Sequence, residues 1–205
     1  NRRSHEILEH RTHFTRRARK HRKDPIVTFK HHPHCRSIRV GKDRGAILMA
    51  GRGGSAYMYS TKTGRFTSTS YYMEKHPAWW EEYYAKSPQN RWFGAQWNVL
   101  LDDARAYARA LPEGQKAAVY HQMTSQMGYR YGTGETEPGP IYYRMLLPSP
   151  YGDEMTADFA LALMKAESVG RNPKGVTDIL TVSFSSHDYI NHNFGPESIQ
   201  SQDHL

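Results

Sequence analysis

The chain has little cysteine, no long apolar run and, over most of its length, no excess of positive charge. Among its 205 residues Cys35 is the single cysteine, which excludes a disulfide within the chain. No apolar run approaches the ~20 residues of a transmembrane helix, and no internal repeat is visible. The length is sufficient for one domain with a hydrophobic core. Because the chain starts at Asn1 rather than Met and ends within a predicted helix, we interpret it as an internal fragment.

The net charge of +8 comes entirely from the first part of the chain. Residues 1–40 hold 12 Lys and Arg against 3 Asp and Glu, whereas the remaining residues carry a net charge of −1. The His-rich cluster at 31–35 lacks the ligand spacing of a zinc finger. We expect the basic, His-rich segment 1–36 to be divergent and disordered, or an out-of-register stretch of the gene. The alternative is a basic arm that binds the phosphates of nucleic acid.

Hydrophobic periodicity predicts an α/β fold with a mostly parallel sheet flanked by helices. The clearest strand is the apolar run at 178–184, which has the composition of a buried strand. A helical pattern at 154–168 precedes it, with Asp153 as the predicted cap. A helix followed by a strand is the rhythm of βαβ units.

The preceding part of the chain contains a second sheet signal. Residues 56–60 and 65–72 flank a turn that ends in Gly64, a pattern typical of a β-hairpin. Residues 112–140 are rich in Gly, Pro, Thr and Glu and predict a long surface insertion. The other predicted elements are a strand at 36–40 and helices at 77–84 and 98–110.

Two candidate metal ligands follow the strand at 178–184. Asp188 and His192 lie four residues apart, just beyond the carboxyl end of this strand, where open α/β sheets bind their ligands. A carboxylate oxygen and an imidazole nitrogen suit zinc or a similar divalent ion. The same spacing also arises when a loop Asp caps the next helix and the His is solvated. A mononuclear site needs at least three protein ligands, so the pair alone is incomplete.

Lys42 and Arg44 follow the predicted strand at 36–40 and are candidates for binding an anion. Most Lys and Arg are ordinary surface cations. The position of these two between a strand and the apolar stretch at 46–49 favours a functional role. The glycines at 51–54 do not form a nucleotide-binding fingerprint and predict a tight turn.

Two stretches resemble segments of the alkaline phosphatase superfamily. They are Ser-Phe-Ser-Ser-His-Asp-Tyr-Ile-Asn-His-Asn-Phe-Gly-Pro-Glu-Ser at 183–198 and Gly-Lys-Asp-Arg-Gly-Ala-Ile-Leu at 41–48. The resemblance is to the type I phosphodiesterase/nucleotide pyrophosphatase branch, and within it to bacterial threonine-nucleophile alkaline phosphatases. It implies that residues 37–205 form part of a catalytic domain with an alkaline-phosphatase-like, mostly parallel sheet and a β-hairpin insertion.

The resemblance implies a hydrolase of small-molecule phosphate monoesters that works through a phosphothreonine at a two-zinc site. Asp188 and His192 would help hold one zinc ion, and Lys42 and Arg44 would bind the substrate phosphate. The nucleophilic threonine is expected upstream and the remaining zinc ligands downstream, so the fragment alone is expected to be inactive. The resemblance also implies a periplasmic or secreted enzyme.

Two other functions remain open. One is a phosphodiesterase or nucleotide pyrophosphatase of the same superfamily, although its members tend to lack the pair formed by Lys42 and Arg44. The other is a noncatalytic basic module that binds nucleic acid, a partner that the resemblance does not favour. The pair Asp203 and His204 is similar to a metal-binding pair of the family, but its sequence context differs, and we interpret it as helical surface. His187 has no ligand role in the family pattern.

Overall fold

The computed structural model describes residues 35–118 and 122–205, and residues 34–205 form one compact unit. The predictions for the basic segment at 1–36 therefore lie almost entirely outside the described residues. None of the described helices is long and apolar enough to cross a membrane.

The secondary structure alternates between strands and helices along the unit. The strands are β1 (Cys35–Gly41), β2 (Ser55–Ser60), β3 (Arg65–Thr67), β4 (Gln96–Trp97), β5 (Tyr129–Arg130) and β6 (Thr177–Val182). The α-helices are α2 (Asp43–Ala50), α3 (Ala78–Ala85), α4 (Pro140–Met145), α5 (Pro150–Ala166), α6 (Ser186–Phe194) and α7 (Ile199–Asp203). Short 3-10 helices are η1 (Pro88–Asn90) and η2 (Ala104–Tyr107).

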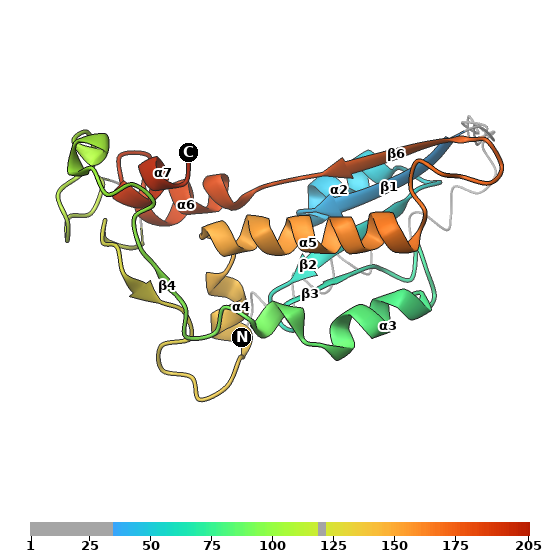
Figure 1. The fold of residues 1–205 in the computed structure, drawn as a ribbon, viewed down its shortest axis with the longest axis horizontal. Helices are drawn as coiled ribbons and strands as arrows, with labels where there is room; N and C mark the ends of the chain where they lie inside the picture. The colour runs from blue at the N-terminus through green and yellow to red at the C-terminus, as the bar shows by residue number, and fades with distance from the viewer. Residues whose placement is uncertain (1–34, 119–121) are drawn as a thin grey trace, which may run out of the picture. The chain divides into compact units, whose positions relative to one another are not determined.

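The main sheet has the strand order β3-β2-β1-β6 (Figure 1). β1 pairs in parallel with both β2 and β6, whereas β3 pairs antiparallel with β2. This confirms the mostly parallel sheet and the β-hairpin, in which Gly64 adopts φ +67° at the end of the turn. The second hairpin strand ends at Thr67, earlier than predicted. β1 begins at Cys35, two residues before the predicted start of the domain.

Helices cover both faces of this sheet. Successive residues of β2 point to opposite faces, and apolar residues of β2 pack against helices on each of them. Tyr57 packs on Phe159 of α5, with ring centroids 5.3 Å apart. Its neighbours in the sequence, Ala56 and Met58, instead join a small cluster with Ala46 and Ala50 of α2. Figure 1 shows α5 running along the sheet.

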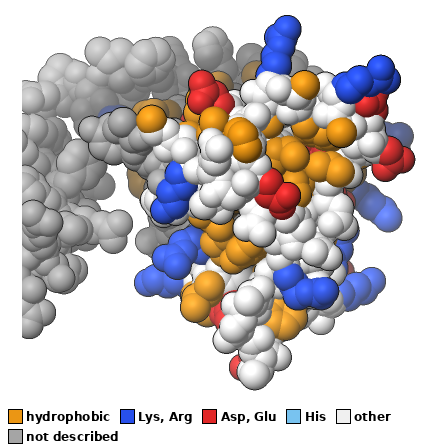
Figure 2. Space-filling view, turned by 90° about the vertical axis from the view of Figure 1, so that its left-hand side faces the viewer, with side chains coloured by type: hydrophobic (Ala, Val, Ile, Leu, Met, Phe, Trp, Pro, Cys, Tyr) orange, Lys and Arg blue, Asp and Glu red, His pale blue; other side chains and the backbone are white. Residues whose placement is uncertain are grey.

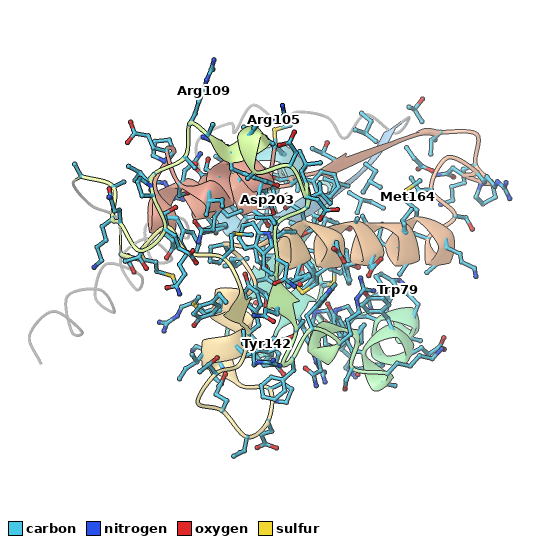
Figure 3. The ribbon with its side chains drawn as sticks, turned by 60° about the vertical axis from the view of Figure 1, so that its left-hand side comes forward. Trp79, Arg105, Arg109, Tyr142, Met164 and Asp203 are labelled. Atoms are coloured by element: carbon cyan, nitrogen blue, oxygen red, sulfur yellow. The ribbon has the colours of Figure 1, made fainter. Side chains whose placement is uncertain are left out.

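An aromatic cluster forms the main core beneath α5. Phe159 is fully buried and its ring stacks on Phe66 of β3 at 4.8 Å. Trp79 of α3, labelled in Figure 3, contacts the same ring at 5.7 Å. The indole nitrogen of Trp79 also donates to Glu167 at the end of α5 over 2.7 Å. These contacts fix α3 and α5 against the sheet.

Three predictions about local structure are wrong. The residues predicted as a helix at 98–110 contain only the short η2, because Asp103 accepts hydrogen bonds from the backbone and side chain of Arg105 and closes a local turn. Asp153 does not cap α5, because Pro150 starts this helix and Ser149 is its N-cap. β6 is not buried on both faces: it lies at the edge of the sheet, and Ile179 is 43% exposed.

The predicted surface insertion at 112–140 contains a strand and buried residues. It contains β5, and Ser125 and Tyr131 are buried.

Elsewhere large apolar side chains remain exposed, and on the face shown in Figure 2 hydrophobic side chains gather between charged ones. Leu48, Leu100 and Leu161 are examples of exposed apolar side chains from three different segments. Such scattered exposure is ordinary for a protein surface.

Candidate functional site

The carboxyl ends of β1 and β6 meet at one edge of the sheet. Val40 is paired with Val182 in the parallel register, and Ser183 N donates to Val40 O at 2.9 Å. Gly41 follows with φ +155°, and a Cβ there would lie only 2.6 Å from Ser183 Cβ. Glycine thus permits the ends of β1 and β6 to approach closely, which brings Lys42 next to the start of α6.

Lys42 and Asp188 form an ion pair across this edge. The Lys42 ammonium donates to Asp188 Oδ2, although the residues are far apart in the sequence. The same ammonium lies 4.2 Å from the centroid of the Tyr189 ring. The hydrogen bond from Lys42 lowers the pKa of Asp188 from its ordinary value, against a smaller opposing effect of burial. Asp188 therefore keeps its negative charge to a lower pH than an ordinary aspartate.

His192 lies one helical turn after Asp188 on α6. Its Nε2 is 3.6 Å from Asp188 Oδ1, and its side chain is 77% exposed. The structure thus brings together three of the four residues singled out in the sequence. The fourth, Arg44, is exposed in the first turn of α2, two residues after Lys42.

The Asp188–His192 pair fits part of a metal site. Two tetrahedral ligands about 2.0–2.1 Å from a zinc ion lie about 3.3 Å apart, close to the 3.6 Å between Asp188 Oδ1 and His192 Nε2. Among residues 35–118 and 122–205, however, no three His, Cys, Asp or Glu side chains gather closely enough to hold a metal. The pair offers two suitable donors, and a complete site requires ligands from elsewhere.

A second group of side chains fixes the start of α6 and was missed in the sequence. Asp153 of α5 accepts a hydrogen bond from Ser186 N at 3.1 Å through Oδ1. Its Oδ2 lies 3.5 Å from His204 Nε2, and the His204 ring stacks on His187 at 5.6 Å. No motif spacing links these positions, because α5 and α6 are separated by a strand.

The interpretation of Asp203 and His204 as helical surface is wrong. The His204 side chain is only 13% exposed, and burial lowers its pKa from the ordinary value. Asp203 accepts a hydrogen bond from the indole nitrogen of Trp97 at 2.7 Å. The pair has a structural position between α6 and the segment that contains β4.

Comparisons with known proteins identify a family and relatives of this chain. Residues 54–205 match the family described as type I phosphodiesterase / nucleotide pyrophosphatase. Alkaline phosphatase PhoV of Synechococcus elongatus is 35% identical over 172 residues, which cover 79% of this chain and 29% of PhoV. A protein of Myroides odoratus named calcium-transporting ATPase is 30% identical over 172 residues, with the same two coverages.

Among solved structures, wild-type alkaline phosphatase PafA has a similar fold. It superposes with a TM-score of 0.64 at 24% identity, and the match covers 82% of this chain and 32% of that chain. At this identity the likeness concerns the fold alone. The chain spans 29% of the length of each of the two curated relatives named above.

Proposed function

Because the chain belongs to the type I phosphodiesterase/nucleotide pyrophosphatase family, we propose that it supplies part of the active site of a metal-dependent phosphate monoester hydrolase. The family resemblance and the fold expected from the sequence are confirmed. The proposal concerns the natural polypeptide that contains residues 35–205, since PhoV has more than three times the matched length.

The observation that carries the proposal is the meeting of Lys42, Asp188 and His192 at one edge of the sheet. We assign Asp188 and His192 as two ligands of a divalent ion, and their oxygen and nitrogen donors suit zinc. Such an ion, when bound, supplies Lewis-acid stabilisation of an ester oxygen. The further ligands of a two-zinc site and the nucleophilic threonine would come from outside the described residues.

The cations at the start of α2 are assigned to the substrate phosphate. Lys42 is the N-cap of this helix and Arg44 lies in its first turn, where the helix dipole favours negative charge. Because the Lys42 ammonium stays beside Asp188, a phosphate that it binds lies next to the metal-ligand carboxylate. Charge-assisted hydrogen bonds from Lys42 and Arg44 would neutralise the non-bridging oxygens as charge shifts in the transition state.

Two cations favour a monoester over a diester. A monoester presents a dianionic phosphoryl group with three non-bridging oxygens, whereas a diester carries one charge and a second substituent. Lys42 and Arg44 match the dianion and crowd the place of the second substituent. A phosphodiesterase or nucleotide pyrophosphatase of the same family is the alternative. No observation on the described residues favours a nucleic-acid-binding module, since that hypothesis falls on the basic segment at 1–36.

The test is the substrate preference of two variants of the natural polypeptide. Removing one transition-state contact typically costs about 2.7–4 kcal/mol, or roughly 10²–10³-fold in rate. Lys42→Ala and Arg44→Ala should therefore lower kcat/KM for 4-nitrophenyl phosphate by about this factor and affect a bis-aryl phosphate far less. Lys86→Ala, which removes an exposed lysine after α3, should leave both values unchanged. Equal losses on both substrates would support the diesterase instead.

A further inference from the structure

A cavity of about 190 Å³ adjoins Lys42. It lies between the first half of α5 and the carboxyl ends of the strands of the main sheet. Its largest apolar wall residues are Tyr59, Phe66, Leu147, Met155 and Tyr189. Lys42 also lines it, together with Asp153, two threonines and three serines, so the group that we assign to phosphate stands in a wall that combines aromatic and aliphatic surface with polar groups.

Three hydroxyls of the wall already have partners within the protein. The Tyr59 hydroxyl donates to Tyr143 O at 2.8 Å. The hydroxyls of Ser183 and Ser185, which also line the cavity, lie 2.8 Å apart and bond each other. An occupant therefore meets ring and methyl surface together with hydroxyls, which favours an uncharged group with an apolar face.

The one acidic side chain among the wall residues restricts the charge of the occupant. Asp153 lines the cavity, with one oxygen bonded to Ser186 N and the other facing His204. Its negative charge opposes the entry of an anion and does not oppose an uncharged ring. A phosphate ester would therefore keep its phosphate at the Lys42 ammonium and place its organic group inside.

The volume limits the size of that group. An apolar cavity of about 150 Å³ is sufficient for one benzene molecule, whereas sites for larger ligands span roughly 300–1,000 Å³. We propose that this cavity binds the organic group of the phosphate monoester, and that this group is a single small uncharged ring, aryl rather than nucleoside. The inference rests on the proposed phosphate site at Lys42 and adds a specificity pocket to it.

The first measurement compares three probes on the 205-residue chain: inorganic phosphate, methyl phosphate and phenyl phosphate. Burial of one phenyl ring should make phenyl phosphate bind about tenfold or more tightly than methyl phosphate. Methyl phosphate and inorganic phosphate should bind alike. Equal affinities for the phenyl and methyl esters would overturn the proposal.

Matched tryptophan variants locate the ring. Thr61 lines the cavity from the turn between β2 and β3, whereas Thr63 in the same turn is exposed and does not line it. Thr61→Trp should fill the space and remove the preference for phenyl phosphate while leaving inorganic phosphate binding unchanged. Thr63→Trp should retain the preference. A preference that survives Thr61→Trp places the ring elsewhere and refutes the assignment.

A measurement on the unaltered chain covers the case in which Thr61→Trp does not fold. With methionine methyl groups labelled by ¹³C, phenyl phosphate should shift the methyl signal of Met155, assigned through Met155→Leu. Met164 on the same helix is 40% exposed and does not line the cavity, so its signal should stay in place. An unshifted Met155 signal at saturating phenyl phosphate would contradict the proposal.

Binding of phenol tests the pocket independently of the phosphate site. If none of the phosphates binds, the assignment of Lys42 fails, but phenol should still bind to the chain and shift Met155. Binding of phenol that Thr61→Trp removes would then support the aryl pocket alone. If inorganic phosphate binds through Lys42 and neither phenol nor phenyl phosphate shifts Met155, the pocket is refuted and the phosphate site stands.

Discussion

The core beneath α5 and the segment at 95–110 are held by different kinds of interaction. In the core, Phe159 packs among aromatic rings, including Phe66 at 4.8 Å and Tyr57 at 5.3 Å. The segment at 95–110 begins with β4, where Trp97 is buried, but after it Leu100 is 78% exposed and the backbone is bonded to one carboxylate, Asp203 of α7. Apolar packing thus holds the elements that carry the site, whereas polar contacts to Asp203 hold the part of the segment that follows β4.

Asp203 is the centre of the second region. It accepts hydrogen bonds from the Trp97 indole nitrogen at 2.7 Å, from Leu100 N at 2.6 Å and from the Tyr107 hydroxyl at 2.5 Å. Figure 3 labels Asp203 near the middle of the view, while Arg109 points away from the molecule. The exposed part of the segment after β4, whose bonds to α7 go to this one acceptor, should open locally more easily than a packed core.

The largest effect should come from breaking the aromatic core. Phe159→Ala removes a fully buried ring and should lower the free energy of unfolding by about 3–5 kcal/mol. Leu161→Ala on the same helix removes a side chain that is 63% exposed and should change it by less than about 0.5 kcal/mol. Urea unfolding of both variants measures the difference. Similar losses in the two would show that α5 is not held through Phe159.

A smaller and local effect should follow from removing the Asp203 carboxylate. Asp203→Ala leaves three donors without their acceptor and should cost about 1–3 kcal/mol. Hydrogen exchange should quicken at 95–107 while amides of α5 keep their protection. Asp102→Ala, at an exposed acidic residue of the same segment, is the control and should leave exchange unchanged. Faster exchange throughout α5 would mean that the two regions do not open separately.

The main sheet and the helix α5 could be predicted from the hydrophobic periodicity of the sequence. The alternation in β2 and the helical spacing in α5 give the sheet and its covering helix, because each apolar side chain has one face to occupy. The motif residues Lys42, Asp188 and His192 also lie together, at the carboxyl ends of the parallel strands β1 and β6.

The features that could not be predicted from the sequence depend on contacts between segments that are distant in the sequence. The helix predicted at 98–110 is absent because Asp103 closes a local turn and Asp203 binds the backbone of the segment. The bond between Asp153 and Ser186 N joins the starts of α5 and α6. No spacing in the sequence between Asp153 and Ser186 predicts this hydrogen bond. The cavity beside Lys42 likewise exists only when α5 lies on the sheet.

The smallest effect should come from the basic segment, which we propose to be dispensable for the fold. Since β1 begins at Cys35, the informative deletion ends before that strand. Removing residues 1–33 should change the free energy of unfolding of the remaining chain by less than about 0.5 kcal/mol, because the segment offers little periodic apolar surface. Urea unfolding before and after the deletion measures this. A loss of several kcal/mol would show that the segment contributes to the core.

The assignment of Asp188 and His192 as metal ligands is tested by the metal content of the natural polypeptide, measured together with hydrolysis of a phosphate monoester. Asp188→Ala and His192→Ala each remove one proposed ligand, so both should lower bound zinc and reduce monoester kcat/KM by at least about 10²-fold. Asp102→Ala should alter neither. Zinc measured by mass spectrometry alongside the hydrolysis rate gives both quantities on one sample. Full zinc content with full activity in either variant would show that the substituted residue is not a ligand.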